Sequence, residues 1–441
     1  MTYCDQIIEN AYVVTVDKDW HTYENGFLAT RGNEIVGVGP MEQSRLFSAT
    51  TRLDASGQIL IPGFVNTHTH IAMAAFRGAS EDVQDRLNRY IFPMERDLVR
   101  PELVYNSSLY CLAEMLLSGT TTFADMYYFE DEVAQAAQQA GLRAILGETV
   151  LGQPAPDAYE PNGGLTYARS FIRKWKGNDL VSPAIAPHAP YTVDEENLRR
   201  SAQLAREMDV PLLMHVAEMD HEHVRFSQSH GSVLRYLDTI DLLNERLIAA
   251  HMLYLDDEDI QRAKDHGVRV AHAPVSNAKS GRPICPAWRM MQAGVKLGLA
   301  TDGPLSGNSM DIPSVLSLFP KLQKTREENR EILTAKEAFR TATLGGAEVL
   351  GLETQIGSLE VGKKADFILI DGDDFNMQPI YDIYATLVYA LKPHNVQHVY
   401  VNGRPLVKDR RIMSFNAEKV KIEMKNIRDT CRGYIAAINS R

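Results

Sequence analysis

Short apolar runs recur through the middle of the chain and alternate with longer segments of helical spacing. The segments between the runs, such as 197–208 and 257–264, place apolar residues three and four positions apart, which predicts helices. The runs lie at 59–65, 120–124, 142–146, 181–186, 210–214, 247–250, 268–271 and 295–300. Eight strands that alternate with helices predict an α/β fold, a (β/α)8 TIM-type barrel over 59–355, with an open doubly wound sheet as the alternative.

Both ends of the chain have another pattern, of short strand-like runs separated by glycines. This pattern fills 1–58 and returns after Gly357, where Asn402-Gly403 gives a hairpin signal. We therefore expect 1–58 and 356–441 to form one smaller β-sandwich domain together. Its C-terminal part should end in a helix, because the last residues combine alternating charges with an apolar face.

Composition restricts the class of partner. The 441 residues include 46 Lys and Arg against 57 Asp and Glu, a formal charge of −11, which disfavours nucleic acid and anionic membranes. No run approaches the roughly 18 apolar residues of a membrane span, and the first ten residues do not resemble a signal peptide. The four cysteines form no CxxC pair, so neither a disulfide framework nor a cysteine zinc site is indicated. We expect a cytoplasmic homo-oligomer that acts on a small molecule.

Histidine or aspartate stands just beyond six of the eight apolar runs. In a (β/α)8 barrel, the C-terminal ends of all strands open onto one face, where active sites form. Random placement of 13 histidines would not produce this pattern. The residues concerned are His68 and His70, His188, His215, His251, His272 and Asp302.

Two of these histidines begin a metal site. His68 and His70 are two positions apart on extended chain, so their side chains point the same way. His215 and Asp302 can complete a mononuclear site of nitrogen and oxygen ligands. This donor set suits one divalent ion, zinc or ferrous iron, and such an ion lowers the pKa of a bound water to near 7.

Other histidines have no convergent context. His221, His223 and His230 lie in a polar stretch with spacings that do not suit one helix face, so we expect them on the surface or in a loop. The cysteines have no basic neighbour that would activate a thiolate, and we expect them to be buried.

Several segments resemble signatures of the amidohydrolase superfamily, in its mononuclear aminohydrolase branch. They are PGFVNTHTH at 62–70, HVAE at 215–218, AHAPVSN at 271–277, ATDGPLSGN at 300–308 and GSLEVGKKADF at 357–367. The resemblance covers nearly the whole chain and implies a metal-bearing barrel with a β-sandwich built from both termini. It also implies roles for three residues: Asp302 takes a proton from the attacking water, Glu218 protonates the substrate ring, and His251 orients the water. Glu218 follows His215 by three positions, so the chain must turn to bring it into the site.

Within that branch, the chain is most similar to the S-adenosylhomocysteine and methylthioadenosine deaminases. HTHIAMAAFRG at 68–78, IFPMERDLV at 91–99 and HAPYT at 188–192 carry this likeness. It implies that Glu95 holds ribose hydroxyls and that His188 lines the pocket. Three features depart from the pattern: Arg86 replaces a tryptophan, Glu148 replaces an arginine that would meet a substrate carboxylate, and the next loop, 153–164, has no arginine of its own. We expect Glu148 to contact the substrate, and methylthioadenosine or adenosine to be favoured over S-adenosylhomocysteine.

Three hypotheses of function remain open at this point. The first is hydrolytic deamination of an aromatic amino-heterocycle, an adenosine derivative above all, with release of ammonia. The second is an aminohydrolase or dechlorinase that acts on another ring, such as a guanine-like base, a pterin or an s-triazine. The third is a metal-free relative that serves as a scaffold, because a fold can outlast its site.

Overall fold

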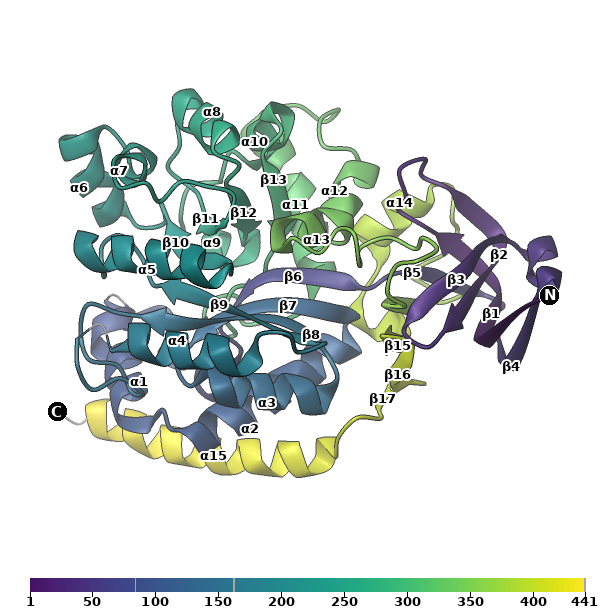
Figure 1. Cartoon of the computed structure of the whole chain (residues 1–441), viewed down its shortest axis with the longest axis horizontal. Coiled ribbons are helices and arrows are strands. Elements are labelled where there is room, and N and C mark those ends of the chain that lie inside the picture. Colours follow the sequence, from purple (N-terminus) through teal and green to yellow (C-terminus); the bar gives the residue numbers. More distant parts are fainter. Residues whose placement is uncertain (84, 162, 440–441) are drawn as a thin grey trace. The chain divides into compact units, whose positions relative to one another are not determined.

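An eight-stranded parallel sheet forms the centre of the computed structural model, which describes residues 1–83, 85–161 and 163–439. Its strands follow the order of the sequence, so each lies beside the next (Figure 1). The amide of Asp302, just beyond the last strand, donates to the carbonyl of His68 in the first at 3.1 Å, which closes the barrel. The strands are β6 (Phe64–Thr69), β7 (Thr120–Tyr127), β8 (Arg143–Val150), β9 (Val181–Pro187), β10 (Leu212–Val216), β11 (Leu247–His251), β12 (Arg269–His272) and β13 (Lys296–Leu299).

Helices alternate with these strands, which confirms the predicted α/β fold and its (β/α)8 barrel. The helices up to β13 are α1 (Phe92–Leu98), α2 (Pro101–Leu117), α3 (Glu130–Ala140), α4 (Gly164–Trp175), α5 (Glu195–Met208), α6 (Asp220–His230), α7 (Val233–Thr239), α8 (Asp257–Asp265), α9 (Pro274–Lys279) and α10 (Ala287–Ala293). Beyond β13 come α11 (Ile312–Arg326), α12 (Ala335–Thr341), α13 (Leu344–Leu350), α14 (Ile383–Ala385) and α15 (Ala417–Asn439). The tyrosine of α15, Tyr434, donates a hydrogen bond to the Pro93 carbonyl of α1 at 3.2 Å.

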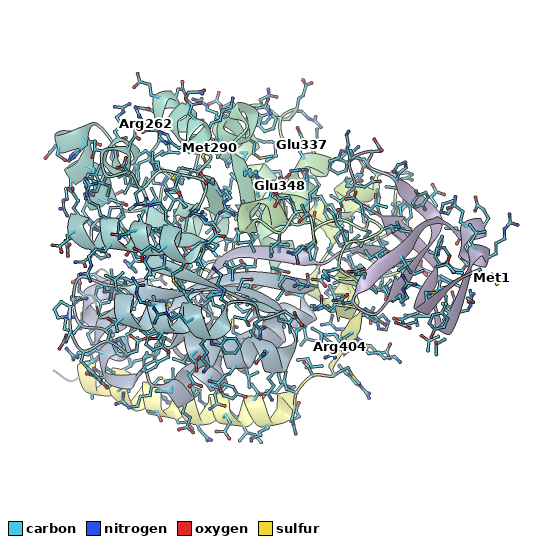
Figure 2. All side chains as sticks on the ribbon, in the orientation of Figure 1. Met1, Arg262, Met290, Glu337, Glu348 and Arg404 are labelled. Carbon is cyan, nitrogen blue, oxygen red and sulfur yellow. The ribbon has the colours of Figure 1, made fainter. Side chains whose placement is uncertain are left out.

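Local sequence explains these elements. All five residues of β10, Leu-Leu-Met-His-Val, are buried, as expected for a parallel strand that is covered on both faces. Helix α5 begins after Asp194, whose carboxylate accepts the Asn197 amide at 3.0 Å and so satisfies one of the exposed N–H groups at the helix start. Figure 2 shows the side chains on these elements; Met290 of α10 is among those that are fully buried.

Both ends of the chain contribute to a separate nine-stranded mixed sheet, as predicted. Its order is β17-β16-β15-β14-β5-β1-β2-β3, and β4 pairs with β1. Strand β14 runs antiparallel to β5, which joins the C-terminal strands to the N-terminal ones. The strands are β1 (Thr2–Val14), β2 (Thr22–Arg31), β3 (Glu34–Pro40), β4 (Phe47–Asp54), β5 (Gln58–Pro62), β14 (Phe367–Asp371), β15 (Val396–Val401), β16 (Arg404–Lys408) and β17 (Arg411–Ile412).

One apolar run serves both sheets. The sequence predicts a single strand over 59–65, whereas the structure divides this run between β5, in the mixed sheet, and β6, in the barrel. Gly63 lies between the two strands, and a Cβ at this position would collide with the side chain of Thr121. Residues on both sides of Gly63 are apolar, because both strands are buried. Hydrophobicity alone therefore does not reveal that the chain passes from one sheet to the other.

Two compact units are distinguished by the contacts within the chain. One comprises 1–66, 114–122 and 311–415, and the other comprises 67–113, 123–310 and 416–441. The domain boundaries expected from the sequence, near residues 58 and 355, stay a prediction. In the part of the chain that the structure describes, no helix has the length and apolar character needed to cross a membrane.

Candidate active site

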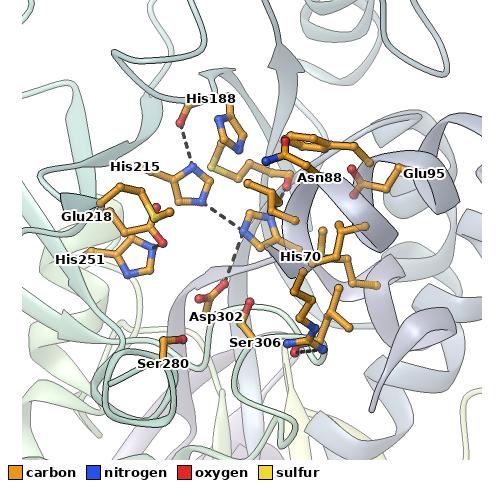
Figure 3. Close-up of a pocket in the computed structure, with 18 of the residues that line it drawn as sticks. His70, Asn88, Glu95, His188, His215, Glu218, His251, Ser280, Asp302 and Ser306 are labelled. Atoms are coloured by element: carbon orange, nitrogen blue, oxygen red, sulfur yellow. Dashed lines mark hydrogen bonds and ion pairs between the residues drawn. The ribbon is translucent and has the colours of Figure 1, made fainter. Parts of the chain in front are cut away.

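The C-terminal ends of three barrel strands bring the predicted ligands together. His68 lies in β6 and His70 directly follows it, His215 lies in β10, and Asp302 comes after β13. All four belong to one compact unit, and each is at most 8% exposed. Figure 3 shows His70, His215 and Asp302 directed toward one another. The barrel therefore converts a pattern of strand-end residues into one cluster.

Distances within this cluster fit a single ion. The Nε2 atoms of His70 and His215 are 3.2 Å apart, and Asp302 Oδ1 lies 3.4 Å from His70 Nε2 and 3.8 Å from His68 Nε2. Ligands placed tetrahedrally at 2.0–2.2 Å from zinc are roughly 3.4 Å from one another. His68, His70 and Asp302 also form one group whose ligand atoms all lie within 4.8 Å of one another, and His215 faces His70, so these distances suit ligands of one ion.

Hydrogen bonds on the far side of two rings fix which nitrogen carries the proton. His70 Nδ1 lies 2.6 Å from the Met126 carbonyl, and His215 Nδ1 lies 2.8 Å from the His188 carbonyl. A carbonyl only accepts, so both Nδ1 atoms carry hydrogen and both Nε2 atoms present lone pairs to each other. His68 Nε2 is buried and has no hydrogen-bond partner among the described residues. Facing lone pairs and an unsatisfied buried nitrogen are what a cation between these rings would resolve.

Burial prepares these side chains for a metal. Burial, followed by the neighbouring rings of His70 and His215, lowers the pKa of His68 well below its usual value, and burial also lowers the pKa of His215. Neutral imidazole is the form that binds metal. For Asp302, burial opposes ionisation, but the rings of His251 and His70 and a hydrogen bond from Ser276 outweigh it and lower the pKa. Ser276 Oγ donates to Asp302 Oδ2 at 2.6 Å, while Oδ1 faces the histidines.

Turns at the strand ends direct the remaining chemistry toward the cluster. Ala217, His251 and Asp302 have φ values of 51°, 75° and 62°, a region that residues other than glycine seldom occupy. The expected turn before Glu218 is therefore present, at Ala217. The buried carboxylate of Glu222 accepts the amides of Glu218 and Met219 at 2.8 and 3.3 Å and holds this turn in place.

Glu218 and His251 lie beside each other in the site. His251 Nε2 is 3.5 Å from Glu218 Oε1, and its Nδ1 is 3.0 Å from Asn277 Oδ1 (Figure 3). Arg282 forms an ion pair with the same oxygen of Glu218. Burial opposes ionisation of Glu218, but the charges of His251 and Arg282 hold its pKa well below the usual range.

A cavity of about 590 Å³ opens over these residues. Its lining includes His70, His188, His215, Glu218 and Asp302 on one side and Glu95 on the other. Tyr127 donates a hydrogen bond to Glu95 Oε1 at 2.9 Å, and burial raises the pKa of Glu95 to about 7. His188 Nδ1 lies 2.8 Å from the Thr192 hydroxyl. The cavity is large enough for a nucleoside-sized molecule between the histidine and aspartate cluster and Glu95.

The structure places Glu148 outside the residues that line this cavity. Its side chain is fully buried in β8, where Oε2 accepts the Glu130 amide at 3.2 Å and the carboxyl lies beside that of Asp157. Burial, with the nearby charge of Asp157, raises its pKa well above the usual value. Its neighbour Thr149 lines the cavity instead. Alternation along the strand explains this, since adjacent residues face opposite sides.

Arg86 does line the cavity, although its guanidinium is held by the protein. Nη2 donates to the Ala79 carbonyl at 2.9 Å and to the Leu305 carbonyl at 3.2 Å, and it pairs with Glu81 at 3.1 Å. Arg86 therefore joins two loops at the edge of the cavity.

Sequence reasoning missed several residues of the site. Ser276 and Asn277 lie within the AHAPVSN motif, which could have identified them, and Tyr127 ends β7, beyond the predicted run 120–124. Arg282 stands alone in a loop without any pattern, and no signal could have identified it. His221 is exposed, as predicted, but it also lines the cavity beside Tyr191.

The chain is similar to known proteins over nearly its whole length. Residues 59–406 match the model of the amidohydrolase family. A 5-methylthioadenosine/S-adenosylhomocysteine deaminase of Syntrophus aciditrophicus is 40% identical over 97% of this chain and 98% of its own length. A 5'-deoxyadenosine deaminase of Methanosarcina mazei is 34% identical over 99% of this chain and 100% of its own. The zinc-bound structure of an adenosine deaminase from Xanthomonas campestris has a TM-score of 0.96 and 33% identity, with 98% of this chain and 99% of that one covered.

Proposed function

This chain belongs to the amidohydrolase family, and on that premise we propose that it is a metal-dependent hydrolytic deaminase of an adenosine derivative, such as methylthioadenosine or adenosine. One observation carries the proposal: buried histidine nitrogens and a carboxylate oxygen face one another at short distances, with Glu218 and His251 beside them. Relatives that are named as deaminases of adenosine derivatives at 34–40% identity support the choice of substrate.

His68, His70, His215 and Asp302 would hold one divalent ion, zinc above all, with ferrous iron as the alternative. When bound, the ion supplies an activated water for attack on the ring carbon that carries the amino group. The zinc-bound adenosine deaminase structure supports zinc.

Proton transfer is assigned to three side chains. Asp302 takes a proton from the attacking water, and Glu218, which is ionised beside His251 and Arg282, receives that proton and delivers it to the ring nitrogen. Glu218 then relays the proton of the added hydroxyl to the departing amine. His251, whose Nδ1 is held by Asn277, directs Nε2 toward Glu218 and orients the water. Water adds to the ring carbon, the carbon–nitrogen bond breaks, and ammonia leaves with the proton that Glu218 relays.

The substrate lies along the cavity in this proposal. His188 contacts it near the metal ligands, and Glu95 accepts hydrogen bonds from ribose hydroxyls at the opposite wall. Glu148 has no part here, because its side chain lies on the face of β8 that points away from the cavity. A carboxylate that receives a hydroxyl proton forms a charge-assisted hydrogen bond, which is stronger than a neutral one.

A substrate panel tests the proposal. Purified protein is incubated with adenosine, methylthioadenosine, 5'-deoxyadenosine, S-adenosylhomocysteine, guanine and an s-triazine, and released ammonia or chloride is measured. We expect ammonia from the adenosine derivatives. Turnover of guanine or the triazine alone would contradict the assignment to nucleosides.

We also propose a cytoplasmic location, since all four cysteines are buried and none forms a disulfide, which is typical of a reducing compartment. Assembly into a homo-oligomer stays a prediction, and light scattering of the purified protein tests it.

A further inference from the structure

Arg282 contacts the residue that the proposed function uses to carry protons. It lies in the loop after α9, where its amide donates to the Asn277 carbonyl at 3.0 Å. Its Nη1 forms the ion pair with Glu218 Oε1, and its Nη2 lies 2.8 Å from the sulfur of Met219. The side chains of Arg282 and Glu218 are only 22% and 13% exposed, so water screens this pair weakly.

The two oxygens of Glu218 are held differently. Arg282 Nη1 and His251 Nε2 both approach Oε1, whereas Oε2 has no hydrogen-bond partner among the residues described. Glu222 fixes the backbone of the same turn through the amides of Glu218 and Met219. Backbone and one oxygen are thus anchored, and the other oxygen is left for the substrate.

The second arginine of the cavity offers a matched comparison. Arg86 and Arg282 both line the cavity, but Arg86 bonds to the Ala79 and Leu305 carbonyls and to Glu81. Among the residues that the structure describes, these partners of Arg86 include none of those assigned to metal binding or proton transfer. A comparison of the two residues therefore distinguishes the effect of a cation that only borders the cavity from that of a cation that contacts Glu218.

We propose that Arg282 is a positioning residue that holds Glu218 with Oε1 anchored and Oε2 directed at the substrate. The inference rests on the proposed function, because it assigns Arg282 a role only through Glu218. Arginine keeps its proton throughout, so it carries none itself, and its planar group fixes the direction of the carboxylate. A glutamate without this partner would lose rotamer order, and a carboxylate that swings away cannot reach the ring nitrogen.

A double-mutant cycle tests this proposal. We compare the wild type, Arg282→Met, Glu218→Gln and the double variant, and measure kcat, KM and bound metal with the preferred nucleoside. Arg282→Met should lower kcat by about 10- to 100-fold, with KM within about 3-fold and bound metal unchanged. In the Glu218→Gln background, the same substitution should change kcat by less than about 2-fold, because its target is gone.

Arg282→Lys keeps a cation and should recover at least half of the lost kcat on a logarithmic scale; it also serves as the test if Arg282→Met does not fold. Arg86→Met is the control, and its effect should multiply with that of Glu218→Gln. A crystal structure of Arg282→Met should show that the Glu218 side chain has moved.

Three results would overturn the inference: independent, multiplying effects of Arg282→Met and Glu218→Gln, an effect of Arg282→Met on KM alone, or an unmoved Glu218 in the variant. Failure of the proposed function looks different, since Glu218→Gln would then keep a near-normal kcat, or the wild type would release no ammonia from any nucleoside.

Discussion

The two sides of the cavity are built in different ways. The metal side consists of residues at the ends of barrel strands, held by short hydrogen bonds to backbone carbonyls and by turns with positive φ. The opposite wall comes from segments between strands, including α1 with Glu95 and the loop that carries Arg86. Strand ends belong to the rigid barrel, whereas loops can change without loss of the barrel.

This difference separates chemistry from specificity. The metal side has every residue that the family resemblance implies. These are His68, His70, His215, Glu218, His251 and Asp302. The opposite wall departs from the family pattern at Arg86, and Glu148 does not line the cavity. Substitutions on the metal side should therefore stop the reaction on every substrate, and those on the opposite wall should change which substrate is preferred.

The largest effect is expected from the metal ligands. His68→Ala should remove the ion and lower kcat by at least about 10³-fold. The substitution deletes Nε2, a buried ligand atom that has no hydrogen-bond partner among the described residues. Elemental analysis measures the ion, and circular dichroism should show an intact fold. His272→Ala is the control, since this buried strand-end histidine lies outside both groups of possible metal ligands and should leave the ion bound. A His68→Ala protein that retains its metal and activity would refute the ligand set.

Glu218→Gln should have the next largest effect. The amide keeps the shape of the side chain but cannot carry a proton, so kcat should fall by about 10²–10⁴-fold. Metal content and KM should stay close to those of the wild type. Steady-state kinetics with elemental analysis checks both, and a near-normal kcat would leave Asp302 or His251 to carry the transfer.

Glu95→Gln tests the opposite wall. The loss of a charge-assisted hydrogen bond, about 1.5–3 kcal/mol, should raise KM for a nucleoside by about 10- to 150-fold with little change in kcat. A free base that lacks the ribose should show no such increase. If Glu95→Gln has the same KM as the wild type for the nucleoside as well as for the base, Glu95 does not belong to the binding site.

The same residue predicts a pH dependence. Burial raises the pKa of Glu95 to about 7, so the carboxyl is neutral below that pH and becomes a charged acceptor above it. KM for a nucleoside should therefore fall as the pH rises through about 7, and Glu95→Gln should lack this change. Initial rates of both proteins between about pH 6 and pH 8 provide the comparison.

The smallest effect is expected at Glu148. Burial favours its neutral form, and glutamine keeps an oxygen that can accept the Glu130 amide. Glu148→Gln should therefore leave kcat and KM within about 3-fold and change the melting temperature little. A large rise in KM for any substrate would return Glu148 to the cavity wall.

Much of the metal side could be predicted from the sequence, because strand alternation and strand ends carry a simple geometry. His68 and His70 face the same way on extended chain, and parallel strands end on one face. The opposite wall of the cavity was harder to predict. Glu148 follows an apolar run and was expected in the wall, but its neighbour Thr149 faces the cavity. Arg282 could not be found at all, because its contact with Glu218 joins residues 64 positions apart through loop conformation.

Zinc titration of metal-stripped protein tests the central claim most directly. Ammonia release from methylthioadenosine or adenosine is measured as zinc is added in steps to a known concentration of chains. Activity should rise linearly from near zero and reach a plateau at one ion per chain, because we assign His68, His70, His215 and Asp302 to a single ion. A plateau at two ions, full activity without added metal, or no ammonia at any zinc concentration would contradict the account.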